Sequence, residues 1–165
     1  MDSLALLGEL GALRHAVRWA AANATFDVDA RVHVFEVTIR ALGGLLSTHM
    51  LLQDGPELVP GYAGELLDTA EDLARRLLPA FGTPTGVPLS WVNLRRGRVR
   101  GDTRVTCVAC AGTLLLEFGA LTQLTGNATY EALARRAVEA VWGEPAGGGG
   151  ELRLRAATAA AAACC

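Results

Sequence analysis

Residues 35–52, FEVTIRALGGLLSTHMLL, decide the fold class, because their apolar residues recur at the spacing of a helix. The steps between them are four, three and four, so they fall on one face that a helix buries. The predicted buried face consists of Phe35, Ile39, Leu42 and Leu46. The sequence around this stretch has the same periodicity almost throughout, which indicates an all-α protein.

A second row on a neighbouring face of this helix combines an acid, a base and a glycine. Its members are Glu36, Arg40, Gly43 and Ser47. Glu36 and Arg40 are one turn apart and are predicted to form an ion pair. Gly43 and Gly44 each cost about 1 kcal/mol relative to alanine, which helices accept where another group must come close. An ion pair on a solvated face, with glycines at a helix crossing, explains the same pattern without any function.

Length and composition favour one globular domain without nucleic-acid binding. The chain has 165 residues, 51% hydrophobic and 19% charged, enough for a real core. The net charge is −2, and the arginine-rich patch at residues 95–104 has only Trp91 as an aromatic neighbour. We interpret the patch as a solvated loop and expect no nucleic-acid partner.

The ends and the apolar runs of the sequence predict a soluble chain. Residues 1–2 lead directly into an amphipathic pattern with no secretory signal. We expect no transmembrane segment, because no apolar run approaches the roughly 20 residues that cross a bilayer.

Four cysteines, Cys107, Cys110, Cys164 and Cys165, are predicted to be structural. The first two have C-x-x-C spacing, but a zinc site needs two more ligands, and the three histidines lie far away in sequence. Thioredoxin-like use would need a βαβ context that is missing.

The helical pattern divides into segments separated by glycine and proline. A first helix is predicted from Leu6, Leu10, Leu13 and Val17, and a third from Leu66, Ala70, Leu73 and Leu77. Pro79 ends the third helix, and residues 91–94 form a short extended piece. A fourth helix covers about 108–124 with Gly126 as its cap, and a fifth covers about 128–142.

Two further patterns concern the organisation of the chain. Residues 72–77 and 132–137 echo each other as DLARRL and ALARRA, which favours stacked helical hairpins. The Gly- and Ala-rich tail, 143–165, carries no packing pattern and is predicted to be disordered or a frayed helix.

Asn23 and Asn127 begin N-x-T sequons, and Asn127 also suits a helix N-cap.

Ordered motifs across residues 2–142 resemble those of the class I α-1,2-mannosidases, glycoside hydrolase family 47. The matching segments are 2–4 (DSL), 26–29 (FDVD), 34–47 (VFEVTIRALGGLLS), 77–81 (LLPAF), 83–88 (TPTGVP), 92–94 (VNL), 112–118 (GTLLLEF) and 124–126 (LTG). Residues 106–113, TCVACAGT, resemble the ER-degradation-enhancing mannosidase-like (EDEM) branch of the family.

This resemblance implies part of an (α/α)7 barrel. It also implies inverting hydrolysis of terminal α-1,2-linked mannose from high-mannose N-glycans, with Ca²⁺ bound, during glycoprotein quality control in the endoplasmic reticulum. By the same resemblance Glu36 is the general acid, while Arg40 and Glu117 bind substrate. An inverting glycosidase needs a second carboxylate to activate water, about 6.5–9.5 Å from the acid.

The sequence also departs from the family pattern. The segments that bear the remaining catalytic carboxylates and the calcium ligands have no counterpart here, residues 143–165 match nothing in the family, and Leu89 stands where an aromatic residue is usual. We therefore expect the 165-residue chain alone to be inactive, and we expect no metal ligand in it. The alternatives are a non-enzymatic helical module that binds mannose glycans or a partner, and an unrelated scaffold of helical hairpins.

Two structural expectations concern the cysteines and the apolar surface. Cys107 and Cys110 are expected to be free thiols, because a bridge between them would close a very small loop at a helix start. An unfinished barrel is expected to expose apolar surface along Leu42, Leu46, Leu114 and Leu121.

Overall fold

The computed structural model describes residues 1–98, 105–142 and 153–155, the last three by their backbone only. Its helices are α1 (Asp2–Leu6), α2 (Leu10–Asn23), α3 (Val34–Val37), the π-helix η1 (Thr38–Leu42), α4 (Gly43–Asp54), α5 (Glu65–Leu77), the 3₁₀ helix η2 (Leu78–Phe81), α6 (Val108–Gly112), α7 (Leu115–Thr125) and α8 (Ala128–Trp142). The strands are β1 (Arg31–His33), β2 (Trp91–Asn93), β3 (Val105–Cys107) and β4 (Arg153–Arg155). The predicted all-α class is correct.

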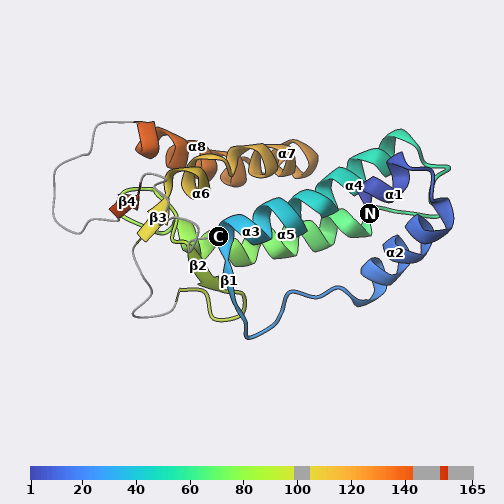
Figure 1. The fold of residues 1–165 in the computed structure, drawn as a ribbon, viewed down its shortest axis with the longest axis horizontal. Helices are drawn as coiled ribbons and strands as arrows, with labels where there is room; N and C mark the ends of the chain where they lie inside the picture. Colours follow the sequence, from blue (N-terminus) through green and yellow to red (C-terminus); the bar gives the residue numbers. More distant parts are fainter. Residues whose placement is uncertain (99–104, 143–152, 156–165) are drawn as a thin grey trace.

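Two helical hairpins build the body of the molecule (Figure 1). Helices α3, η1 and α4 follow one another as one long rod, and α5 packs beside α4. Helices α7 and α8 form the second hairpin, and α7 contacts both α4 and α5. The short strands gather at the end of the rod where α3 begins (Figure 1).

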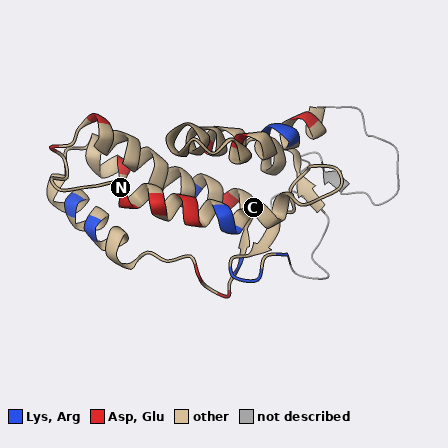
Figure 2. Cartoon of the chain, turned by 180° about the vertical axis from the view of Figure 1, so that it is seen from behind, with Lys and Arg blue, Asp and Glu red and all other residues tan. Residues whose placement is uncertain are grey.

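Helix α5 forms as its sequence predicts. Leu66, Ala70, Leu73 and Leu77 are all 0% exposed. Glu65 and Asp68 stand in the first turn and Arg75 and Arg76 in the last, which complements the helix dipole. Figure 2 shows this order as acidic positions followed by basic ones along the helix.

The expectation of exposed leucines is wrong. Leu42, Leu46, Leu114 and Leu121 are each at most 3% exposed, because the two hairpins cover each other's apolar faces. The large apolar side chains that remain exposed are Leu6, Leu7, Trp19, Val28, Ile39, Met50, Val108, Leu116 and Trp142.

The predicted first helix is two helices. Gly8 adopts a positive φ of 75° between α1 and α2, a conformation that glycine reaches without steric cost. Leu13 and Val17 are buried as predicted, whereas Leu6 ends α1 before this turn and is 77% exposed.

The helix predicted over 35–52 is real but contains a π-helical turn, Thr38–Leu42. A π turn holds more residues than an α turn, so the apolar stripe shifts in phase there. Leu42 and Leu46 are buried, but Ile39 is 39% exposed, which corrects its place in the buried face. Such turns are frequent at functional sites.

An aromatic cluster fixes α7 and α8 against η2. The ring centroids of Phe81 and Phe118 lie 5.2 Å apart, and those of Phe118 and Tyr130 lie 6.3 Å apart. Tyr130 donates its hydroxyl to Glu71 Oε1 at 3.1 Å. Burial raises the pKa of Tyr130 to about 12. This cluster holds Glu117, the neighbour of Phe118, in place.

The predicted extended piece is strand β2, which pairs antiparallel with β1. The sequence did not predict β1, because three residues are too few for a period-2 pattern. Strand β3 pairs in parallel with β4, so residues 153–155 of the tail form a strand rather than a frayed helix. The rest of the tail prediction lies outside the described residues.

The predicted fourth helix is interrupted. Residues 113–114 separate α6 from α7, and Gly126 caps α7 with a φ of 74°, as expected.

Within the described part of the chain, one stretch, Val108–Thr125, is long and apolar enough to cross a membrane, so the expectation that no apolar run approaches that length was too strong. A core helix passes the same test, and Leu114, Phe118 and Leu121 of this stretch are fully buried.

Candidate functional site

Glu36 and Arg40 form the predicted ion pair. Arg40 Nε donates to Glu36 Oε2 at 2.5 Å across the start of the π turn. The Glu36 side chain is 24% exposed and that of Arg40 is 76% exposed. The hydrogen bond that the guanidinium of Arg40 donates to Glu36 raises the pKa of Arg40. The pair is therefore an ordered acid and base that solvent and ligands can reach.

Glu117 is the group that comes close to the glycines. A Cβ added at Gly43 would lie 3.6 Å from Glu117 Cγ and 3.7 Å from Glu117 Oε1. No atom lies within 4 Å of a Cβ added at Gly44, so the prediction of a close approach holds at Gly43 only. Glu117 thus meets the same helical row that carries Glu36 and Arg40.

The Glu117 carboxyl is incompletely paired. Its Oε2 atom is buried and makes no hydrogen bond within the described part of the chain. Desolvation raises the pKa of Glu117 above its ordinary value. A buried acceptor without a partner is costly, so this oxygen is suited to a donor from a bound molecule.

A third acid meets the row at Ser47. Ser47 Oγ donates to Asp2 Oδ2 at 3.1 Å, which joins α1 to α4. The hydrogen bond from the Ser3 backbone N–H is the largest cause of the lowered pKa of Asp2. Three carboxylates therefore lie along the row: Glu36 belongs to it, Glu117 packs at Gly43, and Asp2 bonds to Ser47.

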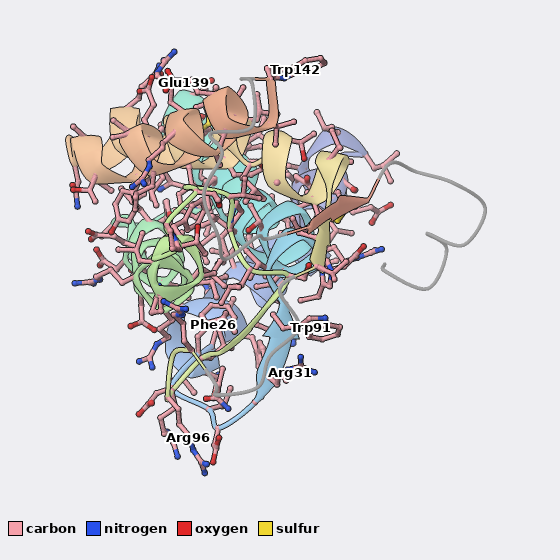
Figure 3. All side chains as sticks on the ribbon, turned by 90° about the vertical axis from the view of Figure 1, so that its left-hand side faces the viewer. Phe26, Arg31, Trp91, Arg96, Glu139 and Trp142 are labelled. Atoms are coloured by element: carbon pink, nitrogen blue, oxygen red, sulfur yellow. A yellow bond between two sulfur atoms is a disulfide. The ribbon has the colours of Figure 1, made fainter. Side chains whose placement is uncertain are left out.

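Strands β1 and β2 hold the start of α3. His33 and Trp91 face each other edge to face with ring centroids 5.0 Å apart, and the Arg31 guanidinium lies 4.7 Å from the centroid of the Trp91 ring. Figure 3 shows Arg31 and Trp91 together at the edge of the molecule. The backbone N–H of Val34, the first residue of α3, donates to Ser90 O at 2.8 Å.

Ser90 also ties this region to β3. Its hydroxyl donates to Val105 O at 2.7 Å, and the residue is only 3% exposed. Ser90 thus connects the strand before α6 with the first turn of the helix that carries Glu36. No sequence pattern marks Ser90, because both of its bonds join segments far apart in sequence.

Asn93 organises the loop at residues 94–98. Its Oδ1 accepts the backbone N–H groups of Arg95 at 3.0 Å and Arg96 at 2.9 Å, and its Nδ2 donates to Asp29 Oδ1 at 2.8 Å. That last bond is the largest cause of the lowered pKa of Asp29. Arg95 pairs with Asp27, and Arg96 with Asp29. The described arginines of the predicted solvated loop are exposed; Arg95 and Arg96 pair with acids, and Arg98 Nη1 donates to Gly82 O at 2.6 Å.

Cys107 and Cys110 form a disulfide, so the expectation of two free thiols is wrong. Cys107 is the N-cap residue of α6 and Cys110 stands in its first turn, which brings the two Cα atoms to 5.0 Å. That separation lies inside the range that a disulfide spans. The helix start therefore permits the small loop.

The described residues contain no cluster of three or more His, Cys, Asp or Glu side chains that could hold a metal ion. Calcium takes six to eight oxygen ligands, so these residues do not fit a calcium site.

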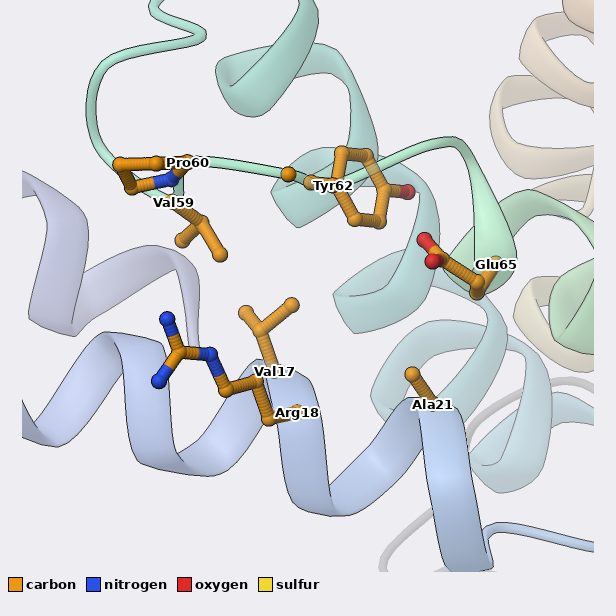
Figure 4. Close-up of a pocket in the computed structure, with 8 residues that line it drawn as sticks. Val17, Arg18, Ala21, Val59, Pro60, Tyr62 and Glu65 are labelled. Carbon is orange, nitrogen blue, oxygen red and sulfur yellow. The ribbon is translucent and has the colours of Figure 1, made fainter.

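A small cavity of about 70 Å³ lies between α2 and the segment 59–65, away from Glu36 (Figure 4). Arg18, Tyr62 and Glu65 line it, and burial raises the pKa of Tyr62 to about 12.

The two sequons differ in their surroundings. Asn127 Oδ1 accepts the backbone N–H of Thr129 at 3.1 Å, so Asn127 caps α8 as predicted. Asn23 is exposed at the end of α2, where its Nδ2 donates to Trp19 O at 2.9 Å. Glycosylation of either asparagine stays a prediction.

Comparison with known proteins identifies the class. The model of glycosyl hydrolase family 47 matches residues 1–150. The structure of an α-1,2-mannosidase from Trichoderma reesei superposes with a TM-score of 0.74 at 34% identity, covering 82% of this chain and 29% of that one. The chain belongs to glycosyl hydrolase family 47, and its two hairpins are part of an (α/α)7 barrel.

Identities to individual curated relatives indicate which branch of the family the chain resembles. The chain is 46% identical over 144 residues to "Alpha-mannosidase I MNS5" of Arabidopsis thaliana, which covers 86% of the chain and 25% of the relative. It is 43% identical over 145 residues to "ER degradation-enhancing alpha-mannosidase-like protein 2" of Homo sapiens, with 86% and 25% covered. Identity to "Mannosyl-oligosaccharide 1,2-alpha-mannosidase MNS1" of Arabidopsis thaliana is 36% over 142 residues, with 84% and 24% covered. The higher identity to the EDEM-like protein agrees with the predicted branch, and the chain spans about a quarter of each relative's length.

Proposed function

We propose that this chain is the part of an EDEM-like α-1,2-mannosidase that carries the general acid. The substrate is a high-mannose N-glycan on a glycoprotein, from which terminal α-1,2-linked mannose is hydrolysed with inversion. The setting is glycoprotein quality control in the endoplasmic reticulum. The names of the EDEM-like relatives support the setting, and the family supports the reaction.

Glu36 is the proposed general acid, and the observation that carries the proposal is its partly exposed carboxyl, which Arg40 holds in one orientation. The 2.5 Å bond from Arg40 Nε fixes one carboxyl oxygen, while partial exposure lets the carboxyl meet a glycosidic oxygen. In an inverting glycosidase this group donates its proton to the leaving oxygen as the C–O bond breaks. Glu36 lies in α3 and Arg40 in the π turn that follows it, so the start of this turn sets their relative position.

Arg40 and Glu117 are the proposed substrate-binding residues. The largely exposed guanidinium of Arg40 has five N–H donors, and its bond to Glu36 uses one of them. The buried Oε2 of Glu117 can accept the hydroxyl group of a sugar, which would satisfy an otherwise unpaired atom. Both lie on or against the helical row that carries the acid.

Two functions of the complete enzyme need other parts of the barrel. The general base that activates water has no candidate matched to the family in this chain. The family's calcium ion supplies oriented coordination of the sugar when bound, and the described residues do not form a site for it. We assign both to segments beyond the region that matches here.

The experiment uses a complete barrel in which residues 1–142 replace the equivalent segment of an EDEM-like mannosidase. Mannose release from a high-mannose glycan is compared for this protein, Glu36→Gln and the matched control Glu139→Gln on the exposed face of α8. We expect release by the parent and the control, and loss of release in Glu36→Gln. Glycan binding by a parent that folds but releases no mannose would instead establish a non-enzymatic glycan-binding module.

A further inference from the structure

The C-x-x-C disulfide is not used by the proposed hydrolysis. We propose that Cys107–Cys110 is a thiol–disulfide exchange site, at which the thiol of glutathione or of a protein cysteine attacks Cys107. The proposal rests on the position, exposure and hydrogen bonding of these two cysteines, and it does not depend on mannose hydrolysis.

The disulfide contributes little to the fold. It closes a loop between residues separated by three positions, and the stabilisation that a disulfide provides is smallest for short loops. Both ends are also held by other contacts. Strand β3 pairs with β4 and accepts the Ser90 hydroxyl at Val105 O, and α6 packs against α8. The chain therefore keeps its fold when the bond opens.

The two sulfur-bearing residues differ in access. Cys107 is 9% exposed and Cys110 is 3% exposed. The intervening Val108 and Ala109 are exposed and offer a small apolar contact to an incoming peptide. Both cysteines are buried, and Cys107 is the less buried of the two, so Cys107 is taken as the attacked sulfur and Cys110 as the leaving group.

A hydrogen bond is in place for the second half of the reaction. The backbone N–H of Cys110 lies 2.9 Å from Cys107 Sγ. A donor at this distance stabilises a thiolate, so Cys107 can depart as the anion.

The complete exchange is balanced in atoms and electrons. A substrate thiolate attacks Cys107 Sγ, a substrate–Cys107 bond forms, the Cys107–Cys110 bond breaks, and Cys110 leaves as a thiolate that takes up a proton. A second substrate thiolate then attacks the substrate sulfur of this mixed disulfide, and Cys107 departs and is protonated. The substrate dithiol loses two electrons and becomes a disulfide, while the cysteine pair gains them and becomes a dithiol.

The experiment isolates the pair by using the full chain with Cys164→Ser and Cys165→Ser. The protein is equilibrated with graded ratios of reduced to oxidised glutathione, quenched in acid, alkylated and analysed by mass spectrometry. Circular dichroism at each ratio reports whether the chain is folded. We expect one two-electron transition from disulfide to dithiol while the chain stays folded.

Single-cysteine variants and a peptide test the direction of attack and the source of the thiol. In the Cys110→Ser variant, oxidised glutathione should form a mixed disulfide on Cys107, about tenfold or more faster than on Cys110 in the matched Cys107→Ser variant, because access and thiolate character set the rate. A peptide dithiol should be oxidised in a one-to-one ratio by the parent. Exchange with glutathione but not with the peptide would assign a small thiol as the substrate.

Three results would overturn the proposal. The first is a pair that stays bonded in excess reduced glutathione. The second is a pair that opens only when the chain unfolds. The third is equal reactivity of the two single-cysteine variants.

Discussion

The side chain of Glu117 packs directly against Gly43, with Glu117 Cγ 3.6 Å from the position that a Cβ at Gly43 would occupy. Gly43 directly follows the π turn. Glu36 and Arg40 precede Gly43 on the same helical row. A glycine in mid-helix therefore has an identifiable neighbour, and that neighbour is a carboxyl with a buried unpaired oxygen. The contact joins the two hairpins at the candidate site.

The two adjacent glycines should respond differently to alanine. Gly44→Ala meets open space and should stabilise the chain by about 1 kcal/mol through helix propensity. Gly43→Ala places a methyl group against Glu117 and should stabilise the chain less, because the methyl group further desolvates the Glu117 carboxyl. Urea denaturation of the two variants measures the difference, and equal gains would contradict the packing described for Gly43.

Glu117 should make stability depend on pH. Its folded pKa is raised, so protonation favours the folded chain. The contribution is fully present below the ordinary value of 4.5 and is lost as pH rises through the folded pKa. Glu117→Gln removes this dependence. Its free energy of unfolding, relative to that of the parent, should therefore increase from pH 4 to pH 7. Urea denaturation at both values measures it, and a difference independent of pH would argue against the effect.

Asn93 should matter more than the ion pairs that it organises. Asn93→Ala removes three hydrogen bonds at a 7% exposed position and should cost about 1–3 kcal/mol. The matched change Arg96→Ala removes an exposed pair with Asp29 and should cost about 1 kcal/mol or less. Thermal unfolding compares the two, and a larger loss for Arg96→Ala would reverse this ranking.

The purified 165-residue chain should release no mannose from a high-mannose glycan, with or without added Ca²⁺. Its family-matched acids are Glu36 and Glu117, and neither is the base that inversion needs. Loss of a catalytic carboxylate costs several kcal/mol of transition-state stabilisation, enough to bring the rate near background. Robust, Ca²⁺-dependent release by the chain alone would contradict this prediction.

Sequence periodicity predicted the helices whose apolar stripes are clean. Helix α5 has apolar residues on one face and charges on the other, so its buried face and its end before Pro79 were both predicted correctly. Helix α7 is apolar on almost every side, and its pattern therefore could not distinguish the buried Leu121 from the 80% exposed Leu116. Periodicity also cannot reveal a π turn, because it assumes the regular spacing that the π turn breaks.

Most of the features that the sequence did not predict depend on contacts between distant segments. The pairing of Glu36 with Arg40 is local to one helix and was predicted. The packing of Glu117 on Gly43 and the two bonds of Ser90 depend on how separate segments meet. The Cys107–Cys110 bond was judged from loop size alone, and the start of α6 brings the two residues within reach.

The most direct test of the account asks whether Glu36 donates the proton to the leaving group. In the complete barrel that carries residues 1–142, the Glu36→Gln variant is assayed on an α-1,2-linked mannose disaccharide and on α-mannosyl fluoride, whose leaving group needs no proton. We predict that cleavage of the disaccharide falls by about 10²–10⁴, the usual contribution of a general acid, while cleavage of the fluoride falls far less. An equal fall for both substrates, or no fall for the disaccharide, would contradict the account.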